Sequence, residues 1–448
     1  MSRSMRIKGP ACVRGSLKLP GDKSISHRVA MLASIANGQS TVSGFASSVD
    51  CHSTLDCIRK LGIRVEDTGS KLLIHGQGLF GYGPPAFNNQ IAVRLDARNS
   101  GSTIRMISGL LAGQSFISEI TGDASLCRRP MARIIEPLGL MGAQVDATGG
   151  NFPPLTIRGQ KLRAIGYESP VASAQVKTCV LLAGLLADGT TVYCEPALSR
   201  DHTELMLKEF GAVIDGHSSG TLSIEGLQEL TPIDYQVPGD VSSAAFFIAA
   251  ASVLPGSELT LQGVGLNPTR TAFLEAMTHL GASVSTRNVS KQHGEPVGDI
   301  VVVNASLRSD RQAAVLRGAI IPNIIDEIPI LAVVATQVEG RVEIRDAGEL
   351  RIKESDRIRA VADGIRSLGG EIEEFEDGFA VTGPQRLVGG RVETAGDHRI
   401  AMAFTIGGLI AEGTTEIIDA DCAGVSYPEF YETLAMLAGP EIVAPIQT

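Results

Sequence analysis

The sequence predicts an α/β protein built from six copies of one βαβαββ-like unit. Each copy has an extended start, a small polar cluster, an apolar helix, and a Gly followed by a Thr- or Val-rich strand. A second helix then leads into another strand, as in LGIRVED from Leu61 and MGAQVDA from Met141. The spacing, about 75 residues, is too long for a solenoid repeat. The six copies start at Leu17, Val93, Tyr167, Tyr235, Ala319 and Val392.

The first copy, LKLPGDKSISHRVAMLASIANGQSTVSG, predicts a strand from Leu17, a helix whose first turn contains Lys23, and a second strand. VRLDARNSGSTIRMISGLLAGQSFISEITG and YESPVASAQVKTCVLLAGLLADGTTVYCEP follow the same order in the next two copies. The last three copies are YQVPGDVSSAAFFIAAASVLPGSELTLQG, AIIPNIIDEIPILAVVATQVEGRVEIRDAG and VETAGDHRIAMAFTIGGLIAEGTTEIID. We therefore expect an apolar helix after each polar cluster.

The polar clusters indicate anion binding. At the start of a helix, unpaired backbone N–H groups and the positive end of the helix dipole favour negative charge. Six such starts that face one cleft would form an anion-binding chamber. For any single copy, an ordinary N-cap is an equally good explanation, because Ser and Asp are favoured caps.

Length and composition indicate a globular protein of two or three domains, with 448 residues of which 44% are hydrophobic and 20% charged. Six copies divide most simply into three and three. Matching sequences, LPGD at 19–22 and VPGD at 237–240, lie three copies apart, and we place the crossings between two lobes there. The predicted lobes are residues 22–240, and residues 1–21 together with 241–448.

Several classes of partner are not expected. A net charge of −10, 4% aromatic residues and the absence of Trp argue against nucleic-acid binding. Seven cysteines without a CxxC pair indicate reduced thiols in a cytoplasmic protein. The N-terminus lacks the apolar core of a signal peptide, and the longest apolar run, 244–254, is too short to span a membrane. We expect a cytoplasmic monomer with no membrane partner.

The motif PGDKSISHR supplies the first candidate anion clamp. Lys23 and Ser24 fall in the first helical turn, and Arg28 lies one turn after Ser24. An ammonium, a hydroxyl and a forked guanidinium suit a phosphate and a carboxylate. The P-loop pattern GxxxxGK[ST] is absent. The alternative is a basic turn that faces water.

Four more motifs offer candidate polar groups. In NSGSTIR, Gly101 allows close approach of the backbone to a ligand, and in RRPMAR, Arg129 is a weaker candidate. SAQVK places Ser173 and Gln175 at a helix start, and SRDHTE offers Ser199 and Arg200 as a second contact for an oxyanion.

The fifth copy carries candidate acid–base groups. Asp326 lies in IIDEIP, and LRIKESDRI contains Lys353, Glu354 and Arg357. Lys353 and Arg357 are four residues apart, which predicts that they share one helical face. Asp326 and Glu354 could divide the work of general base and acid, because cations keep a carboxylate ionised and burial favours its protonation. The alternative is a helix surface with salt bridges. The sixth copy adds Arg399 in GDHR.

PGDKSISHR, NSGSTIR, RRPMAR, SAQVK, SRDHTE, NPTRT, DEIP, RIKESDR and GDHRIAM resemble the motifs of the enolpyruvyl transferase family, in the family's order and across nearly the whole chain. The members that act on shikimate 3-phosphate are the most similar. The resemblance implies a two-lobed inside-out α/β barrel with three repeats per lobe and the active site in the cleft between lobes. It also implies that the 5-hydroxyl of shikimate 3-phosphate adds to C2 of phosphoenolpyruvate, after which phosphate leaves, with no cofactor.

The resemblance also implies roles for single residues. The shikimate 3-phosphate site would consist of Lys23, Ser24, Arg28, Ser173, Ala174, Gln175, Arg200, Asp326 and Lys353. The phosphoenolpyruvate site would consist of Lys23, Gly101, Arg129, Gln175, Arg357 and Arg399. The catalytic residues would be Asp326, which takes the hydroxyl proton, Glu354, which protonates the methylene carbon, and Lys23.

Charge balance fits this assignment without a metal. Each substrate carries a carboxylate and a phosphate, so the pair brings roughly five to six negative charges. No spacing of His, Cys and Asp predicts a metal site. Seven cations oppose the charge of the substrates: Lys23, Arg28, Arg129, Arg200, Lys353, Arg357 and Arg399.

Two positions depart from the family pattern. Val425 stands before SYP where many members have Lys, so one contact to phosphoenolpyruvate is lost or replaced. GDK, SAQVK, RDHTE and NPTR are similar to the form tolerant to the herbicide glyphosate, whereas Gly101 lacks the larger side chain of some tolerant forms.

The motifs leave two alternative functions. Enolpyruvyl transferases that act on UDP-N-acetylglucosamine have a loop Cys five residues before the Arg of the RP pair. Here Ala124 has that position, and Cys127 is only two residues before Arg129. A non-catalytic scaffold that binds acidic ligands would not need two paired carboxylates. Release of phosphate from phosphoenolpyruvate with each acceptor separates these possibilities.

Overall fold

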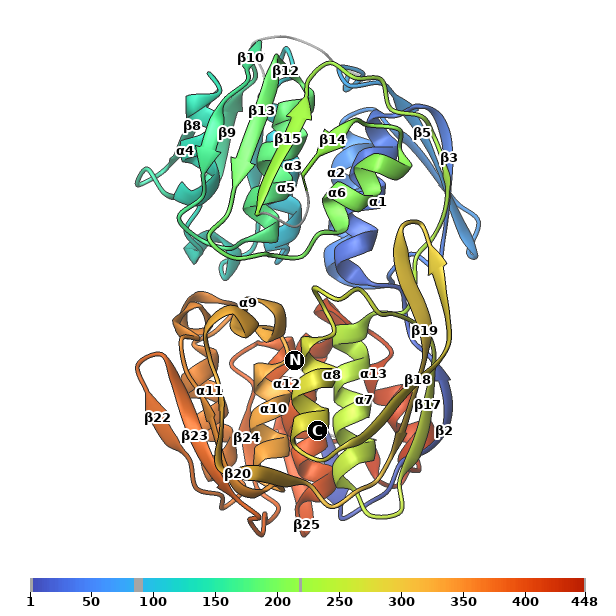
Figure 1. Ribbon diagram of the computed structural model, residues 1–448, viewed down its shortest axis with the longest axis vertical. Coiled ribbons are helices and arrows are strands. Elements are labelled where there is room, and N and C mark those ends of the chain that lie inside the picture. The colour runs from blue at the N-terminus through green and yellow to red at the C-terminus, as the bar shows by residue number, and fades with distance from the viewer. Residues whose placement is uncertain (1–2, 84–91, 217–219, 447–448) are drawn as a thin grey trace. The chain divides into compact units, whose positions relative to one another are not determined.

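The computed structural model describes residues 3–83, 92–216 and 220–446 and has a mixed α/β fold (Figure 1). The chain forms two compact units. Unit 2 contains residues Gly21–Val237 and Gln292–Glu295. Unit 1 contains Met1–Pro20, Pro238–Lys291 and Pro296–Thr448.

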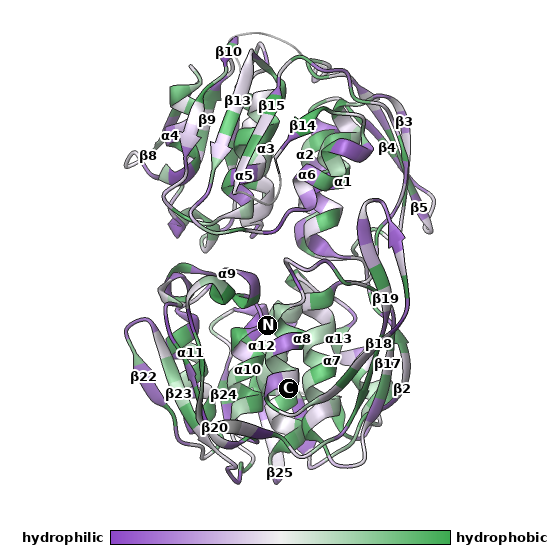
Figure 2. Cartoon of the chain, in the orientation of Figure 1, coloured by the Kyte–Doolittle hydropathy of each residue, from purple (hydrophilic) through white to green (hydrophobic). Residues whose placement is uncertain are grey.

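Three helices with long apolar runs lie at the centre of each unit and contact one another. In unit 2 they are α1 (Lys23–Ile35), α3 (Gly101–Ala112) and α5 (Ala174–Leu185). In unit 1 they are α7 (Val241–Val253), α10 (Ile328–Ala335) and α12 (His398–Ile410). Nearly every residue of α7 and α12 is buried, as expected for helices that are apolar on all sides. Figure 2 shows α10 as largely apolar and the strand β22 (Glu373–Phe375) as polar.

The remaining described helices complete the helical part of the fold. Those of unit 2 are α2 (Val49–Lys60), η1 (Leu126–Arg128), α4 (Ala132–Leu140) and α6 (His202–Glu209). Those of unit 1 are α8 (Ala272–His279), η2 (Gly318–Ile320), α9 (Ile321–Ile324), η3 (Gly348–Ile352), α11 (Arg357–Ser367), η4 (Ala420–Val425) and α13 (Phe430–Ala438).

The described residues of unit 2 form three four-stranded sheets, in the orders β16-β3-β5-β4, β6-β7-β9-β8 and β11-β13-β15-β14, and a small β10-β12 pair. In each four-stranded sheet one outer pair is parallel and the other pairs are antiparallel. The strands are β3 (Asn37–Ser43), β4 (Arg64–Asp67), β5 (Lys71–Gln77), β6 (Val93–Asp96), β7 (Ile117–Thr121), β8 (Gln144–Thr148), β9 (Phe152–Arg158), β10 (Leu162–Arg163), β11 (Gly166–Glu168), β12 (Ala187–Asp188), β13 (Thr190–Cys194), β14 (Ile214–Asp215), β15 (Thr221–Glu225) and β16 (Asp234–Gln236).

The other three sheets have the orders β18-β19-β17-β2, β20-β21-β23-β22 and β24-β25-β1-β26. Each has one parallel pair at an edge, and in the described parts of the chain no sheet closes into a barrel. The strands, besides β22, are β1 (Met5–Gly9), β2 (Arg14–Lys18), β17 (Glu258–Gly265), β18 (Ser283–Gln292), β19 (Glu295–Val303), β20 (Arg308–Leu316), β21 (Glu339–Ile344), β23 (Gly378–Gly383), β24 (Arg391–Glu393), β25 (Gly413–Ile418) and β26 (Val443–Pro445).

The first strands of the first and fourth copies are exchanged. β2 pairs in parallel with β17, with Leu17 opposite Leu261. β16 pairs in parallel with β3, with Tyr235 opposite Val42. The extended start of the first copy thus lies in a sheet of unit 1, and the start of the fourth copy lies in a sheet of unit 2.

The helix predicted after each polar cluster is confirmed in all six copies. The extended start predicted at Ala319 is wrong, because residues from Gly318 form η2 and α9 and the preceding strand, β20, ends at Leu316. Pro322 explains the difference, since it lies in the first turn of α9, where proline is well accommodated.

Among the described residues, no single helix combines the length and the apolar character that a membrane crossing requires, although the bent pair Gly318–Ile324 and Ile328–Ala335 passes a test of length and composition.

Candidate functional site

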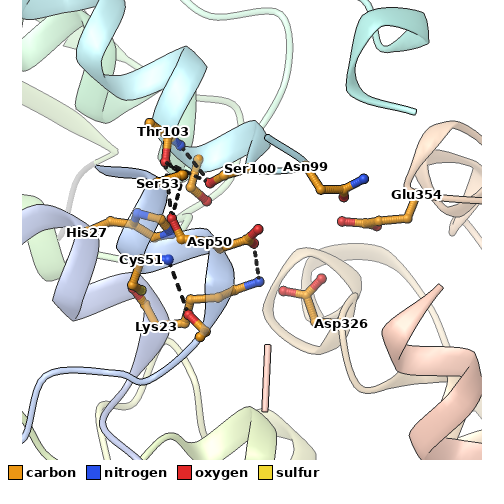
Figure 3. A network of polar contacts seen from close by, with 12 residues as sticks. Lys23, His27, Asp50, Cys51, Ser53, Asn99, Ser100, Thr103, Asp326 and Glu354 are labelled. Atoms are coloured by element: carbon orange, nitrogen blue, oxygen red, sulfur yellow. Dashed lines mark hydrogen bonds and ion pairs between the residues drawn. The ribbon is translucent and has the colours of Figure 1, made fainter. Parts of the chain in front are cut away.

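Lys23 opens α1 in unit 2 and forms a close ion pair. Asp22 caps the helix, since its Oδ1 accepts a hydrogen bond of 2.9 Å from the backbone N–H of Ile25. Lys23 Nζ donates to Asp50 Oδ2 at 2.9 Å (Figure 3). Asp50 is buried, whereas Lys23 keeps part of its side chain exposed. An anion that binds Lys23 would therefore compete with a carboxylate that already holds the ammonium in place.

A buried network of hydroxyl groups connects the starts of α1, α2 and α3 (Figure 3). His27 Nδ1 lies 2.7 Å from Thr54 Oγ1, and Thr54 Oγ1 lies 2.7 Å from Thr103 Oγ1. Ser53 Oγ lies 3.0 Å from Thr103 Oγ1, which donates to Ser100 Oγ at 2.8 Å. Burial holds the pKa of His27 well below its ordinary value, so the ring is neutral. The network fixes Ser100, the N-cap of α3.

Two guanidinium groups lie beside Gly101, the first residue of α3. A Cβ at Gly101 would lie 3.0 Å from Arg105 Nη1 and 3.5 Å from Arg129 Nη1. Arg129 is buried and donates to the Asn99 side chain at 2.7 Å, and Arg105 Nη1 donates to Gln175 Oε1 at 2.9 Å. Sequence reasoning did not assign Arg105, although its position one helical turn after Gly101 is a usable signal.

The start of α5 is bonded to the start of α3. Gln175 Nε2 donates to Ser102 Oγ at 3.0 Å. Ser173 caps α5, with its Oγ 3.5 Å from the backbone nitrogen of Val176. Ala174 is the first helical residue. The predicted groups of the second and third copies are therefore neighbours within unit 2.

Arg28 is buried and holds three helices together. Its Nε donates to Thr203 Oγ1 in α6 at 2.7 Å, and its Nη2 donates to Thr178 Oγ1 in α5 at 3.0 Å. Its Nη1 donates to the carbonyl oxygen of Ser24 in α1 at 2.9 Å. Whatever Arg28 binds, it also supports the scaffold from which Ser24 and the start of α5 project.

Arg357 gathers three carboxylates in unit 1. Only 1% of its side chain is exposed. Its Nε donates to Asp397 Oδ2 at 2.8 Å, and its Nη2 donates to Glu354 Oε2 at 2.6 Å. Its Nη1 lies 3.5 Å from Asp326 Oδ1. Burial works against the charge of Arg357, but Asp397 and Glu354 outweigh it and raise the pKa of the guanidinium.

Loop positions, rather than one helix, present the acidic groups. Asp326 lies in the turn between α9 and α10, and Lys353 and Glu354 lie between η3 and α11. The prediction that Lys353 and Arg357 share a helical face is wrong, because α11 begins only at Arg357. Asp356 caps that helix, and an N-cap residue has a non-helical backbone. Lys353 therefore lies before the helix and Arg357 within it. Burial lowers the pKa of Lys353, and Asp326 opposes that shift.

Asp397, which sequence reasoning did not assign, organises the start of α12. Its Oδ1 accepts a hydrogen bond of 2.9 Å from the backbone N–H of Arg399. Its Oδ2 accepts one of 3.0 Å from Ser355 Oγ. Arg399 is buried, and its Nη1 donates to the carbonyl oxygen of Ser242 at 3.3 Å. Asp397 therefore fixes both Arg357 and Arg399.

Each unit has its own chemical character. Unit 2 presents cations and an amide at the starts of three helices, an arrangement suited to oxyanions. Unit 1 presents Asp326 and Glu354, both partly exposed, beside a buried guanidinium. Carboxylates with some access to solvent and a fixed cation nearby are suited to accepting and donating protons.

Comparison with known proteins gives a consistent result. A family model described as EPSP synthase (3-phosphoshikimate 1-carboxyvinyltransferase) matches residues 7–434. A 3-phosphoshikimate 1-carboxyvinyltransferase of Solibacter usitatus is 49% identical over 433 residues, which cover 97% of this chain and 99% of the relative. A protein of the same name from Bacillus cereus is 46% identical over 427 residues, 95% of this chain and 97% of the relative.

Solved structures are similar along the whole chain. An EPSP synthase from Acinetobacter baumannii has a TM-score of 0.86 and 38% identity, with 100% of both chains covered. The enolpyruvyl transferase NikO from Streptomyces tendae has a TM-score of 0.80 and 16% identity, with 100% of this chain and 99% of that chain covered. At that low identity, the second likeness concerns the fold alone.

Proposed function

The chain belongs to the EPSP synthase family, and from this premise we propose how its residues divide the work of the reaction. It is a 3-phosphoshikimate 1-carboxyvinyltransferase. The enzyme transfers the enolpyruvyl group of phosphoenolpyruvate to the 5-hydroxyl of shikimate 3-phosphate and releases phosphate. The reaction belongs to the shikimate pathway, which leads to chorismate and the aromatic amino acids.

We propose that shikimate 3-phosphate binds mainly to unit 2. The starts of α1 and α5 offer an ammonium, hydroxyls and backbone N–H groups, and Arg200 lies in the segment before α6. These groups suit a phosphate and a carboxylate on one ring. The proposed binding residues are Lys23, Ser24, Arg28, Ser173, Ala174, Gln175, Arg200, Asp326 and Lys353.

Phosphoenolpyruvate needs cations for its phosphate and its carboxylate. Gly101 leaves room beside Arg129, and Arg105 holds Gln175 by a hydrogen bond of 2.9 Å. Arg357 and Arg399 lie close to Asp397 in unit 1. The proposed binding residues are Lys23, Gly101, Arg129, Gln175, Arg357 and Arg399.

Asp326 and Glu354 carry the proton transfers in this proposal. Asp326 takes the proton of the 5-hydroxyl while the hydroxyl oxygen forms a bond to C2 of phosphoenolpyruvate. At the same time, protonated Glu354 gives a proton to C3, the methylene carbon. In the second step C3 returns a proton to Glu354 and the bond from C2 to the phosphate oxygen breaks, which restores the double bond. The proton taken from the hydroxyl leaves with the phosphate. Lys23 offsets the charge that develops on the substrates.

The contact between Arg357 and Glu354 is the observation that carries this assignment. The 2.6 Å bond favours an ionised Glu354 before substrates bind. A substrate carboxylate that binds Arg357 would compete for the guanidinium and place negative charge beside Glu354. Both effects favour the protonated carboxyl that the first step requires. The guanidinium of Arg357 can thus bind phosphoenolpyruvate and, when it does so, favour the protonated form of Glu354.

The architecture is also part of the proposal. We propose an inside-out α/β barrel of six βαβαββ-like repeats, three per lobe, with lobes at 22–240 and at 1–21 with 241–448. The support is a pattern shared by the six four-stranded sheets of the described residues, each of which has a parallel pair at an edge. We also propose a cytoplasmic monomer that acts without nucleic acid. The seven cysteines are all free, which suits a reducing compartment.

A phosphate-release assay tests the acceptor. With phosphoenolpyruvate, we expect phosphate to appear when shikimate 3-phosphate is added, and not when UDP-N-acetylglucosamine or no acceptor is added. Asp326→Asn is the matched control, because the amide cannot take the hydroxyl proton. Release with UDP-N-acetylglucosamine alone would assign the chain to the alternative reaction. Release without any acceptor would contradict transfer.

Gly101→Ala tests the phosphoenolpyruvate site. The added methyl group would lie 3.0 Å from Arg105 Nη1, so that side chain must shift by a few tenths of an ångström. We expect the KM for phosphoenolpyruvate to rise by roughly 3- to 30-fold, since small displacements of binding groups are costly. The KM for shikimate 3-phosphate should stay within about twofold.

Gly139→Ala in α4 provides the control for this prediction. Apart from its chain neighbours and the backbone of its own helix, a Cβ there would have no atom within 4 Å. Steady-state kinetics with each substrate varied in turn distinguishes the two variants. Equal KM values for phosphoenolpyruvate in Gly101→Ala and Gly139→Ala would contradict the placement of that substrate beside Gly101.

A further inference from the structure

Lys177 is a buried cation in α5 with no role in the reaction proposed above. Only 1% of its side chain is exposed. Its Nζ donates to Glu195 Oε1 at 3.0 Å and to Glu204 Oε1 at 2.8 Å. A third bond, of 3.2 Å, goes to the carbonyl oxygen of Ser199. An ammonium buried to this degree is retained only with such partners, and those partners show what it supports.

The three partners surround the segment that carries Arg200. Glu195 directly follows β13, and Glu204 lies in the first turn of α6. Lys177 therefore connects the two ends of the segment between them. Because the hydrogen bonds of Lys177 reach both ends of the segment, a substitution of Lys177 would change the backbone conformation from 195 to 204.

Ser199, directly before Arg200, has all its polar groups engaged in this cluster. Its backbone N–H donates to Glu195 Oε1 at 3.0 Å, and its hydroxyl donates to Glu195 Oε2 at 2.6 Å. Its carbonyl oxygen accepts from Lys177. The hydroxyl of Ser199 is thus already bonded within the protein. What the cluster controls is the direction in which the chain leaves Ser199, and hence the position of Arg200.

We propose that Lys177 is a positioning residue for Arg200, which it holds in place for the phosphate of shikimate 3-phosphate. The inference rests on the role proposed for Arg200. Lys177 also shares α5 with other proposed ligands, since its backbone N–H donates to the carbonyl oxygen of Ser173 at 2.9 Å. The side chain of Lys177 thus links the segment of Arg200 to α5, the helix whose start carries Ser173 and Gln175, which are proposed to bind the same substrate.

The charge of the cluster explains why a cation is needed. Glu195 and Glu204 are both buried beside Lys177, so their carboxylates depend on it for compensation. Burial raises the pKa of Glu204, and Lys177 opposes that shift. Within the described part of the chain, Glu204 Oε2 is buried without a hydrogen-bond partner. Without Lys177, the segment would have to open so that water could reach the carboxylates, and Arg200 would move with it.

Lys177→Met tests the proposal, with Lys208→Met as the matched control on exposed α6 surface. We expect Lys177→Met to raise the KM for shikimate 3-phosphate about 10-fold, the scale of a misplaced binding group. The KM for phosphoenolpyruvate, measured with shikimate 3-phosphate saturating, should change by less than about twofold. A merely structural role would lower the amount of active enzyme and leave both KM values unchanged, and that result would overturn the proposal.

A double-mutant cycle with Arg200→Ala separates this inference from the proposed function. If Lys177 acts through Arg200, its effect on the KM for shikimate 3-phosphate should fall below about twofold in the Arg200→Ala background. An equal effect in both backgrounds would overturn positioning while leaving the role of Arg200 intact. If Arg200→Ala alone leaves that KM unchanged, the role of Arg200 in binding is itself overturned, and the inference with it.

Ser199→Ala keeps the test decisive if Lys177→Met does not fold, which far-UV circular dichroism would reveal. It removes the 2.6 Å bond to Glu195 without leaving a buried charge unpaired. We expect the KM for shikimate 3-phosphate to rise about threefold, the equivalent of a typical hydrogen bond, and not to rise further in the Arg200→Ala background. An unchanged KM in Ser199→Ala would contradict the proposal.

Discussion

Glu354→Gln is expected to lower kcat by about 10²- to 10⁴-fold, the usual contribution of a general acid or base. The amide has the size of the carboxyl group, and its oxygen can still accept the hydrogen bond from Arg357 Nη2, which measures 2.6 Å in the native protein. The geometry around Arg357 should therefore survive, while the proton for C3 of phosphoenolpyruvate is lost. The rate of phosphate release at saturating substrates measures the effect.

Glu376→Gln is the control for this prediction, because it makes the same substitution at an exposed position of unit 1. A second measurement follows the proton directly. In deuterated water, a reversible proton transfer to C3 exchanges the methylene hydrogens of phosphoenolpyruvate, and Glu354→Gln should slow this exchange together with turnover. Turnover equal to that of Glu376→Gln would remove Glu354 from the mechanism.

Arg357→Met is expected to reduce the free energy of unfolding by about 3 to 5 kcal/mol, the usual cost of removing one partner from a buried ion pair. Asp397 is fully buried and accepts two hydrogen bonds from Arg357, of 2.8 and 3.2 Å. Without the guanidinium it becomes a buried carboxylate without its cation. Urea denaturation followed by far-UV circular dichroism measures the change, since the chain contains no Trp.

The matched control is Arg359→Met, two residues further along α11, where the side chain is exposed and pairs with Asp363. Such exposed pairs are screened by solvent and contribute little to stability. In the Asp397→Asn background, Arg357→Met should reduce the free energy of unfolding by at least about 1 kcal/mol less than it does in the native protein. The reason is that Asn keeps the N-cap of α12 and removes the uncompensated charge. Equal destabilisation by Arg357→Met and Arg359→Met would show that the cluster does not stabilise the fold.

Local signals made the helices predictable. Asp22, Ser100, Ser173 and Asp397 each precede an apolar run, and each caps a helix in the structure. The matching LPGD and VPGD sequences indicated where the chain crosses between lobes, but not which strands β2 and β16 would pair with. An extended segment has the same alternation whichever sheet it joins, and the partner of Leu17, Leu261, lies far away along the chain.

The candidate site was predictable in its residue types and less so in its partners. Helix starts indicated the positions of Lys23 and Gln175, because the dipole and free N–H groups belong to the local sequence. The carboxylates that hold the cations were missed, since Asp397 pairs with Arg357 and Asp50 with Lys23 only after the chain has folded. The type of a charged residue shows which chemical groups it can bind, but its actual partner depends on the tertiary fold.

The position of β1 affects how the protein is made on the ribosome. Met5 leaves the ribosome long before its partners, since it lies opposite Ile417 of β25 and Pro445 of β26 in the finished sheet. At about 5 to 20 residues per second, translation needs about 20 to 90 s before those partners exist. For that time β1 lacks both of its partner strands, and a chain that stops short of β26 leaves one edge of this sheet uncovered.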